Sequence, residues 1–189
     1  WLPAFDQVIT LGPEEWAKVR SLRRGPVCTF PKLLGINPDH FKTNTTPENR
    51  EVDVFISGNM SSHYHPDKAR LLQALLEDTS LHIRSMDGFL PSSSYASELM
   101  RSKVSFTYVR HPGSMPSRGV ESLAAGCAVL TQAGSALALY VSQNEGVHTY
   151  EPDHLADRIY DLVENWRTVG PQAQRGSQIM RREFQQSRC

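Results

Sequence analysis

The sequence contains few cysteines and no surplus of charge of either sign, and each shortage argues against a class of protein. Only three of its 189 residues are cysteines, and they lie far apart at Cys28, Cys127 and Cys189. An odd number of cysteines without metal-ligand spacing argues against a disulfide framework and favours a reducing compartment, so we expect a cytoplasmic protein. Basic and acidic residues balance at 20 each. This balance argues against broad binding to nucleic acid or anionic membranes, which requires a basic surplus.

Long apolar runs are also missing. The longest apolar stretch, residues 123–130, is interrupted by Gly126 and is far shorter than the roughly 18 residues that a membrane span requires. We therefore expect no membrane span. No signal-peptide pattern opens the chain, and its first residue is Trp1 rather than methionine. We expect the sequence to be a fragment of a longer chain.

Several common catalytic and cofactor signatures are absent. The apolar run at residues 52–57 ends at Gly58 and continues with Asn59, so it lacks the Gly-x-Gly-x-x-Gly dinucleotide fingerprint. The sequence has no Walker loop, no Ser-His-Asp signature and no zinc pattern. His63 and His65 lie two residues apart, but no third ligand stands at a telling distance. We expect no metal there and a loop that faces solvent or substrate.

After residue 50 the sequence alternates between short apolar runs and amphipathic segments. Strands are expected at residues 52–57, 81–86, 104–109, 128–131 and 147–150. Helical patterns separate them, and the clearest is the apolar stripe from Leu155 to Trp166, which we expect Gly170 and Pro171 to interrupt. Strands and helices that alternate with short connections predict an α/β fold with a doubly wound, parallel, Rossmann-like sheet.

Ligands of such a sheet bind beyond the carboxyl ends of its strands. This rule nominates the loops at residues 58–65, 87–91 and 111–119. The third loop is the most informative, because it leads into a short helix expected over residues 120–125 and contains glycines that permit close backbone approach. Asp87 and Gly88 begin the second loop, where they suit either a ligand contact or an ordinary turn.

Arg118 and Glu121 stand at the entrance to that short helix. Arg118 is placed to make charge-assisted hydrogen bonds to a diphosphate. Glu121 falls in the first turn of the expected helix, where the helix dipole favours a carboxylate, and it can accept two hydrogen bonds from a vicinal diol such as a ribose. The pair therefore suits a nucleoside diphosphate. The plainer alternative is that Arg118 and Glu121 form an ion pair with each other.

The spacing Arg-x-x-Glu-x-x-Ala-x-Gly at residues 118–126 is the core of a longer pattern over residues 117–130. Followed by Gly134 and by Asp153-x-Leu155-Ala156, this pattern resembles the C-terminal, donor-binding half of the GT-B glycosyltransferases. More narrowly, it resembles their group-1, family-4-like branch and its spore-maturation-protein-like relatives. The resemblance runs from about residue 53 to about residue 166.

The resemblance also implies a domain organisation. Residues 35–41 are similar to the linker that joins the two halves of such enzymes. Residues 1–45 are then the tail of an N-terminal acceptor domain with its linker, and residues 46–189 are the nucleotide-sugar-binding domain with a C-terminal helix. The rest of the N-terminal domain of the same protein is an implied partner.

In this family the carboxylate that matches Glu121 binds the ribose, and a basic residue that matches Lys68 or Arg70 binds the diphosphate. We prefer Arg70, because the spacing Tyr64-x-Pro66-x-x-x-Arg70 is similar to that of the spore-maturation-type relatives. No catalytic residue is assigned. The residues expected to bind the donor are Gly58, Lys68, Arg70, His111, Gly113, Ser114, Ser117, Arg118, Gly119 and Glu121.

One position departs from the family pattern. The motif Glu-x7-Glu of the group-1 branch places its first glutamate at Gly113, where this sequence has no side chain. We expect the backbone amides of Gly113 and Ser114 to face the donor instead. The missing carboxylate also puts in doubt the usual contact to the donor sugar.

The resulting prediction is a glycosyltransferase that moves a sugar from a nucleoside diphosphate sugar to a hydroxyl acceptor, without a cofactor or metal. By itself the fragment is expected to bind a nucleotide and to transfer no sugar. Two alternatives stay open. One is a Rossmann-like binding module that has lost its chemistry, which Gly113 favours, and the other is a sugar-nucleotide epimerase of the same architecture.

Overall fold

The computed structural model describes seven stretches of the chain: residues 8–10, 13–22, 27–29, 36–41, 46–77, 80–110 and 113–183. Five strands form one parallel sheet in the order β4-β3-β5-β6-β7. The strands are β3 (Val52–Ser57), β4 (Ile83–Met86), β5 (Ser102–Phe106), β6 (Ala128–Gln132) and β7 (Val147–Tyr150). All five lie within two or three residues of the expected positions, so the α/β class and the parallel sheet are confirmed.

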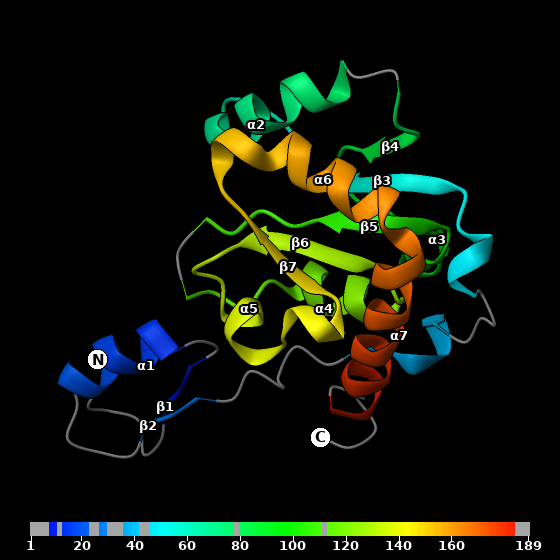
Figure 1. The fold of residues 1–189 in the computed structure, drawn as a ribbon. Coiled ribbons are helices and arrows are strands. Elements are labelled where there is room, and N and C mark those ends of the chain that lie inside the picture. The colour runs from blue at the N-terminus through cyan, green and yellow to red at the C-terminus, as the bar shows by residue number, and fades with distance from the viewer. Residues whose placement is uncertain are drawn as a thin grey trace.

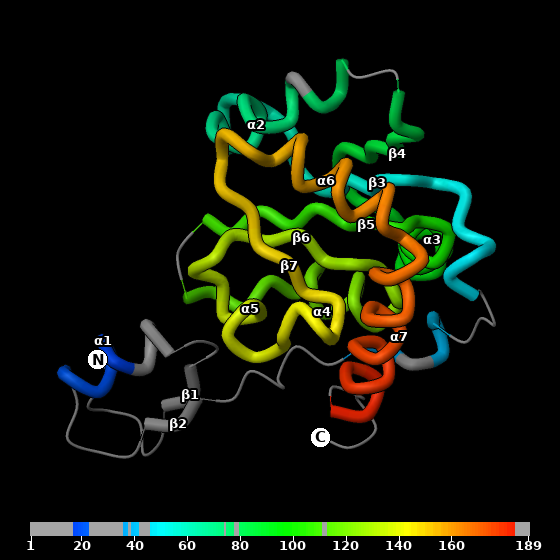
Figure 2. Tube along the Cα trace, viewed as in Figure 1, coloured from blue at the N-terminus to red at the C-terminus, as the bar shows by residue number. Residues whose placement is uncertain are grey.

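Helices cover both faces of this sheet (Figure 1). They are α2 (Pro66–Leu76), α3 (Ser92–Met100), α4 (Ser117–Ala124), α5 (Ala136–Tyr140), α6 (Leu155–Glu164) and α7 (Trp166–Glu183). Successive side chains of a strand point to opposite faces. Val54 and Ile56 pack with α2 and α6, whereas Phe55 packs with α3, α4 and α5. Figure 2 shows the same layers, with α2 and α6 on one side of the sheet and α4 and α5 on the other.

The segment before the main sheet forms a small unit of its own. Its strands β1 (Val8–Thr10) and β2 (Val27–Thr29) pair in parallel beside α1 (Pro13–Leu22). A 3-10 turn at Pro38–Phe41 then brings Ile36 and Phe41, which are buried, against α3. The expected division at residues 45 and 46 stays a prediction.

The last two helices meet at a different place from the one expected. The break lies at Asn165, and α7 continues through Gly170 and Pro171. Pro171 stands in the second turn of α7, so its missing N–H removes only the hydrogen bond to the carbonyl of Arg167. Gly170 has a packing role, because a Cβ there would lie 2.8 Å from Cβ of Pro47.

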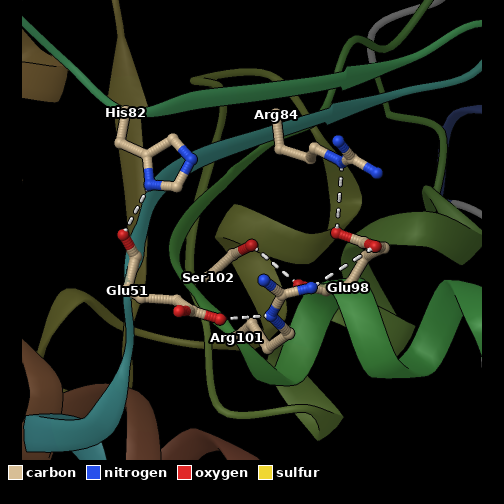
Figure 3. Close-up of polar contacts among 6 residues, drawn as sticks. All are labelled: Glu51, His82, Arg84, Glu98, Arg101 and Ser102. Atoms are coloured by element: carbon tan, nitrogen blue, oxygen red, sulfur yellow. Dashed lines mark hydrogen bonds and ion pairs between the residues drawn. The ribbon is translucent and has the colours of Figure 1, made fainter.

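A polar network ties edge strand β4 to the neighbouring elements at the amino ends of the strands (Figure 3). His82 Nδ1 lies 2.8 Å from the carbonyl oxygen of Glu51, whose carboxylate pairs with Arg101. Arg84 on β4 pairs with Glu98 on α3, with 3.5 Å between Nε and Oε2. The pair of Glu51 and Arg101 is exposed, whereas Glu98 is mostly buried, and we regard both pairs as structural.

Arg50 acts as a buried clamp just before β3. Its guanidinium donates to the carbonyl oxygens of Leu99 at 3.2 Å, of Ala125 at 2.6 Å and of Ser102. Leu99 and Ala125 belong to the ends of α3 and α4, where helix carbonyls lack a partner within their own helix. Arg50 therefore joins these two helix ends to the start of the sheet. No described helix has the length and apolar character needed to cross a membrane.

Candidate functional site

Two neighbouring pockets open at the carboxyl ends of β3, β4 and β5. The first, here the Glu121 pocket, has a volume of about 110 Å³. Its lining residues are Ser57, Gly58, Met86, Gly88, Phe89, Leu90, Ser92, Tyr95, Arg118 and Glu121. The second, here the Lys68 pocket, has a volume of about 370 Å³. Its lining residues are Ser57, Asn59, His65, Lys68, Phe106, Thr107, Tyr108, Pro116, Ser117 and Arg118.

The side chain of Arg118 lies over Gly58 and takes part in both pockets. A Cβ on Gly58 would lie 1.3 Å from Nη1 of Arg118, so the guanidinium occupies space that only glycine leaves free. Gly58 also has a φ of +91°, a left-handed conformation that favours glycine. The backbone at the end of β3 thus makes room for a cation between the two pockets.

Helix α4 begins at Ser117, three residues earlier than expected. Arg118 is therefore in the first turn, and Glu121 is in the second, which corrects the sequence-based placement of this carboxylate. Arg118 and Glu121 lie three residues apart on one helix, a spacing that allows an ion pair. They do not form one: among the described residues, neither side chain has a hydrogen-bond or ion-pair partner. The plainer alternative for these two residues is therefore wrong.

Glu121 is a half-buried carboxyl. Burial raises its pKa, while the nearby charges of Arg118 and His40 act in the opposite direction. His40 was not expected in the site, because its position depends on how the turn before the main sheet packs on α3. Tyr95 was missed for a similar reason. It reaches the pocket from α3, and burial raises the pKa of its hydroxyl to about 12.

Lys68 forms part of the second pocket, and Arg70 does not. Lys68 is buried, and its Nζ donates to the carbonyl oxygens of Ser57 at 3.0 Å and Asn59 at 3.2 Å. Burial, together with the charge of Arg118, lowers the pKa of Lys68 to about 8. Arg70 points to solvent and pairs with Asp67 at 3.3 Å. This geometry reverses the preference for Arg70.

His65 stands at the rim of the Lys68 pocket. Its ring meets that of Tyr108 edge to face, with centroids 6.3 Å apart, and its Nδ1 lies 3.5 Å from Nη2 of Arg110. Burial lowers the pKa of His65, and the charges of Arg110, Lys68 and Arg118 lower it further. His63 lies outside the pocket. The described residues contain no group of three His, Cys, Asp or Glu side chains that could hold a metal.

Gly113 lines neither of the two pockets. Its amide donates to the carbonyl oxygen of Gly134 at 2.6 Å, so it is not free to bind a ligand. The carbonyl oxygen of Ser114 accepts from the amide of Ala136 at 3.1 Å. These bonds attach the loop to the start of α5. The expectation that the Gly113 amide faces a donor is wrong, and neither Gly113 nor Ser114 lines the Glu121 pocket or the Lys68 pocket.

The remaining expected residues have different positions. Ser117 lines the Lys68 pocket. Gly119 is a packing residue, because a Cβ there would lie 2.6 Å from Cδ2 of Leu137 on α5. His111 lies outside the described residues. Asp87 holds the neighbouring loop by accepting a hydrogen bond from the amide of Met60 at 3.1 Å.

A parallel sheet with this strand order and with pockets at its carboxyl ends has the architecture of the C-terminal, Rossmann-like domain of GT-B glycosyltransferases. A family model described as glycosyl transferase-like matches residues 48–188. The chain belongs to this family. No curated protein matches the sequence.

Solved structures of low sequence identity share the fold. Sucrose-phosphate synthase from Thermosynechococcus elongatus superposes with a TM-score of 0.73 at 16% identity, over 99% of this chain and 56% of that protein. HepE from Anabaena, solved with UDP and glucose, superposes with a TM-score of 0.69 at 13% identity. The match covers 95% of this chain and 59% of HepE. The C-terminal domain of LpcC from Francisella tularensis superposes with a TM-score of 0.60 at 12% identity. The match covers 80% of this chain and 100% of that domain. The chain thus spans little more than half of the first two proteins.

Proposed function

We propose that this chain is the donor-binding half of a glycosyltransferase that uses a nucleoside diphosphate sugar. The observation that carries the proposal is a pair of side chains of opposite charge, the half-buried Glu121 and the exposed Arg118, on one helix at the carboxyl ends of the strands; among the described residues neither has a hydrogen-bond or ion-pair partner. A carboxylate and a guanidinium that leave each other free are suited to bind a ligand that carries both hydroxyl donors and negative charge.

The two pockets suit the two parts of such a donor. Glu121 can accept hydrogen bonds from the ribose, with the base toward the apolar side chains of Met86 and Leu90 in the same pocket. Lys68 and Arg118 face the second pocket, where they can neutralise the diphosphate. Arg118 lines both pockets and so stands where the ribose and the first phosphate would meet.

Chemistry at the site follows from this placement of charge. When the bond between the sugar and the diphosphate breaks, negative charge develops on the departing phosphate oxygen. Lys68 and Arg118 are already in place around that position, so no reorganisation is needed when the charge appears. A hydroxyl acceptor and any general base would come from the partner domain, and we therefore expect this chain alone to bind the donor without transferring the sugar.

Calorimetry and thermal unfolding with UDP, GDP and ADP test the proposal. A ligand at 100 times its Kd stabilises a folded protein by about 2.7 kcal/mol, so one nucleotide should raise the melting temperature clearly. Glu121→Ala should weaken binding about tenfold or more and should remove the preference for ribose over 2′,3′-dideoxyribose. Arg118→Ala should weaken binding of the diphosphate itself. The matched control is Glu164→Ala, which replaces an exposed glutamate on α6 and should leave nucleotide binding unchanged.

The competing function is a binding module without donor recognition. Failure of every nucleoside diphosphate to bind would favour that alternative and reject the proposal. Sugar transfer by the isolated chain would instead show that the acceptor site lies within these residues. The assignment to the narrower spore-maturation-like branch remains a prediction.

A further inference from the structure

The Lys68 pocket is lined by cationic and neutral groups only. Lys68, Arg118 and His65 face it, and none of its lining residues is an aspartate or glutamate. The acid whose charge acts on the pKa of Lys68 is Asp87, which does not line the pocket and already accepts a hydrogen bond from the amide of Met60. The pocket thus offers a strong positive field without a carboxylate to accept hydrogen bonds from sugar hydroxyls.

A further cation stands at the rim. Arg110 is exposed, and its Nη2 lies 3.5 Å from Nδ1 of His65. Because a guanidinium can only donate, this contact requires Nδ1 of His65 to accept, so the proton of the neutral ring is on Nε2. Within the part of the chain that the structure describes, Arg110 forms no ion pair with an acid. Arg110 and His65 therefore form a pair of donors with no protein anion to bind.

A diphosphate does not use all of these donors. Its two negative charges are matched by Lys68 and Arg118, which leaves Arg110 beside His65 at the rim of the pocket. Cations are therefore in excess at this rim of the pocket, and no aspartate or glutamate lines the pocket to balance them.

We propose that the sugar carried by the donor is acidic, with a carboxylate that Arg110 and His65 bind. The planar guanidinium of Arg110 matches a carboxylate in a two-pronged hydrogen bond, and Nε2–H of His65 supplies a further donor. This inference rests on the proposed function and narrows its substrate class to sugars of the uronic acid type.

The test compares two donors that differ only at C6 of the sugar, a neutral hydroxymethyl group in one and a carboxylate in the other. The chain is first titrated with UDP and GDP to identify the base, and then with UDP-glucose and UDP-glucuronate or with GDP-mannose and GDP-mannuronate. A charge-assisted hydrogen bond predicts about tenfold tighter binding of the acidic sugar. Arg110→Gln should remove this preference. Arg167→Gln, which replaces an exposed arginine on α7, should keep the preference for the acidic sugar.

The outcomes separate the inference from the function on which it rests. Binding of a nucleoside diphosphate, with the neutral sugar bound as tightly as the acidic one, overturns the inference and leaves the proposed function standing. A preference that Arg110→Gln does not change also overturns it, because the carboxylate would then lie elsewhere. Absence of binding by all three of UDP, GDP and ADP rejects the proposed function together with the inference.

Discussion

Nη1 of Arg118 occupies the space beside Cα of Gly58 that any other residue at this position would fill with its Cβ, which would lie 1.3 Å away. Gly58 is the first residue after β3, and Arg118 is in the first turn of α4, so the contact joins elements that are 60 residues apart. This contact sets the position of the cation between the two pockets. Its geometry leads directly to a first prediction.

Gly58→Ala should displace Arg118 and weaken binding of inorganic pyrophosphate about tenfold. The substitution should also destabilise the fold by about 1 kcal/mol, because the backbone has a positive φ. Gly88→Ala controls for that strain. Gly88 has a φ of +85°, yet nothing lies within 4 Å of a Cβ placed there. Equal loss of pyrophosphate binding in both variants, measured by calorimetry, would mean that strain and not Arg118 is responsible.

Lys68→Met should weaken UDP binding about tenfold or more, whereas Arg70→Met should leave it unchanged. Burial lowers the pKa of Lys68 to about 8, so the ammonium loses its proton as the pH rises above that value. The affinity of the unmodified chain for UDP should therefore fall between pH 8 and pH 9, and the affinity of Lys68→Met should not. A decrease in affinity confined to Arg70→Met would restore the original sequence-based preference.

Glu121 should lower the stability of the folded chain above its ordinary pKa of 4.5, because burial raises the pKa of the folded carboxyl. The folded state then holds the proton more tightly than the unfolded state, so stability decreases as the pH rises from about 4.5 through the folded pKa. Glu121→Gln removes this loss. Urea unfolding from pH 4 to pH 7 should show a growing advantage for the glutamine variant, absent in Glu164→Gln. A difference that stays constant with pH would contradict this prediction.

Arg50→Met should destabilise the fold by about 3 kcal/mol, because it removes a buried cation and leaves the carbonyl oxygens of Leu99, Ser102 and Ala125 without this donor. Arg101→Met removes an exposed ion pair with Glu51 and should cost less than about 1 kcal/mol. Chemical denaturation measures both. Similar losses in the two variants would show that the buried clamp contributes little.

Much of the fold could be read from local pattern. The period of apolar residues decides whether a segment can bury one face as a strand or as a helix, and this held for residues 52–57 and for the stripe that begins at Leu155. Helix ends were harder to place. Nothing in the local sequence shows that α4 starts at Ser117 or that α7 continues through Pro171, because both features depend on how neighbouring elements pack.

The sequence alone determined the alternating architecture and the segment around Arg118 and Glu121, because periodicity and short-range spacing are properties of neighbouring residues. Only the tertiary structure decided which of two nearby cations faces the ligand side. Lys68 and Arg70 lie two residues apart on α2, and a helix turns about 100° per residue, so one reaches the buried end of β3 and the other reaches solvent. It also decided that His40, Tyr95 and Arg110 belong to the site, because their approach depends on how distant segments pack.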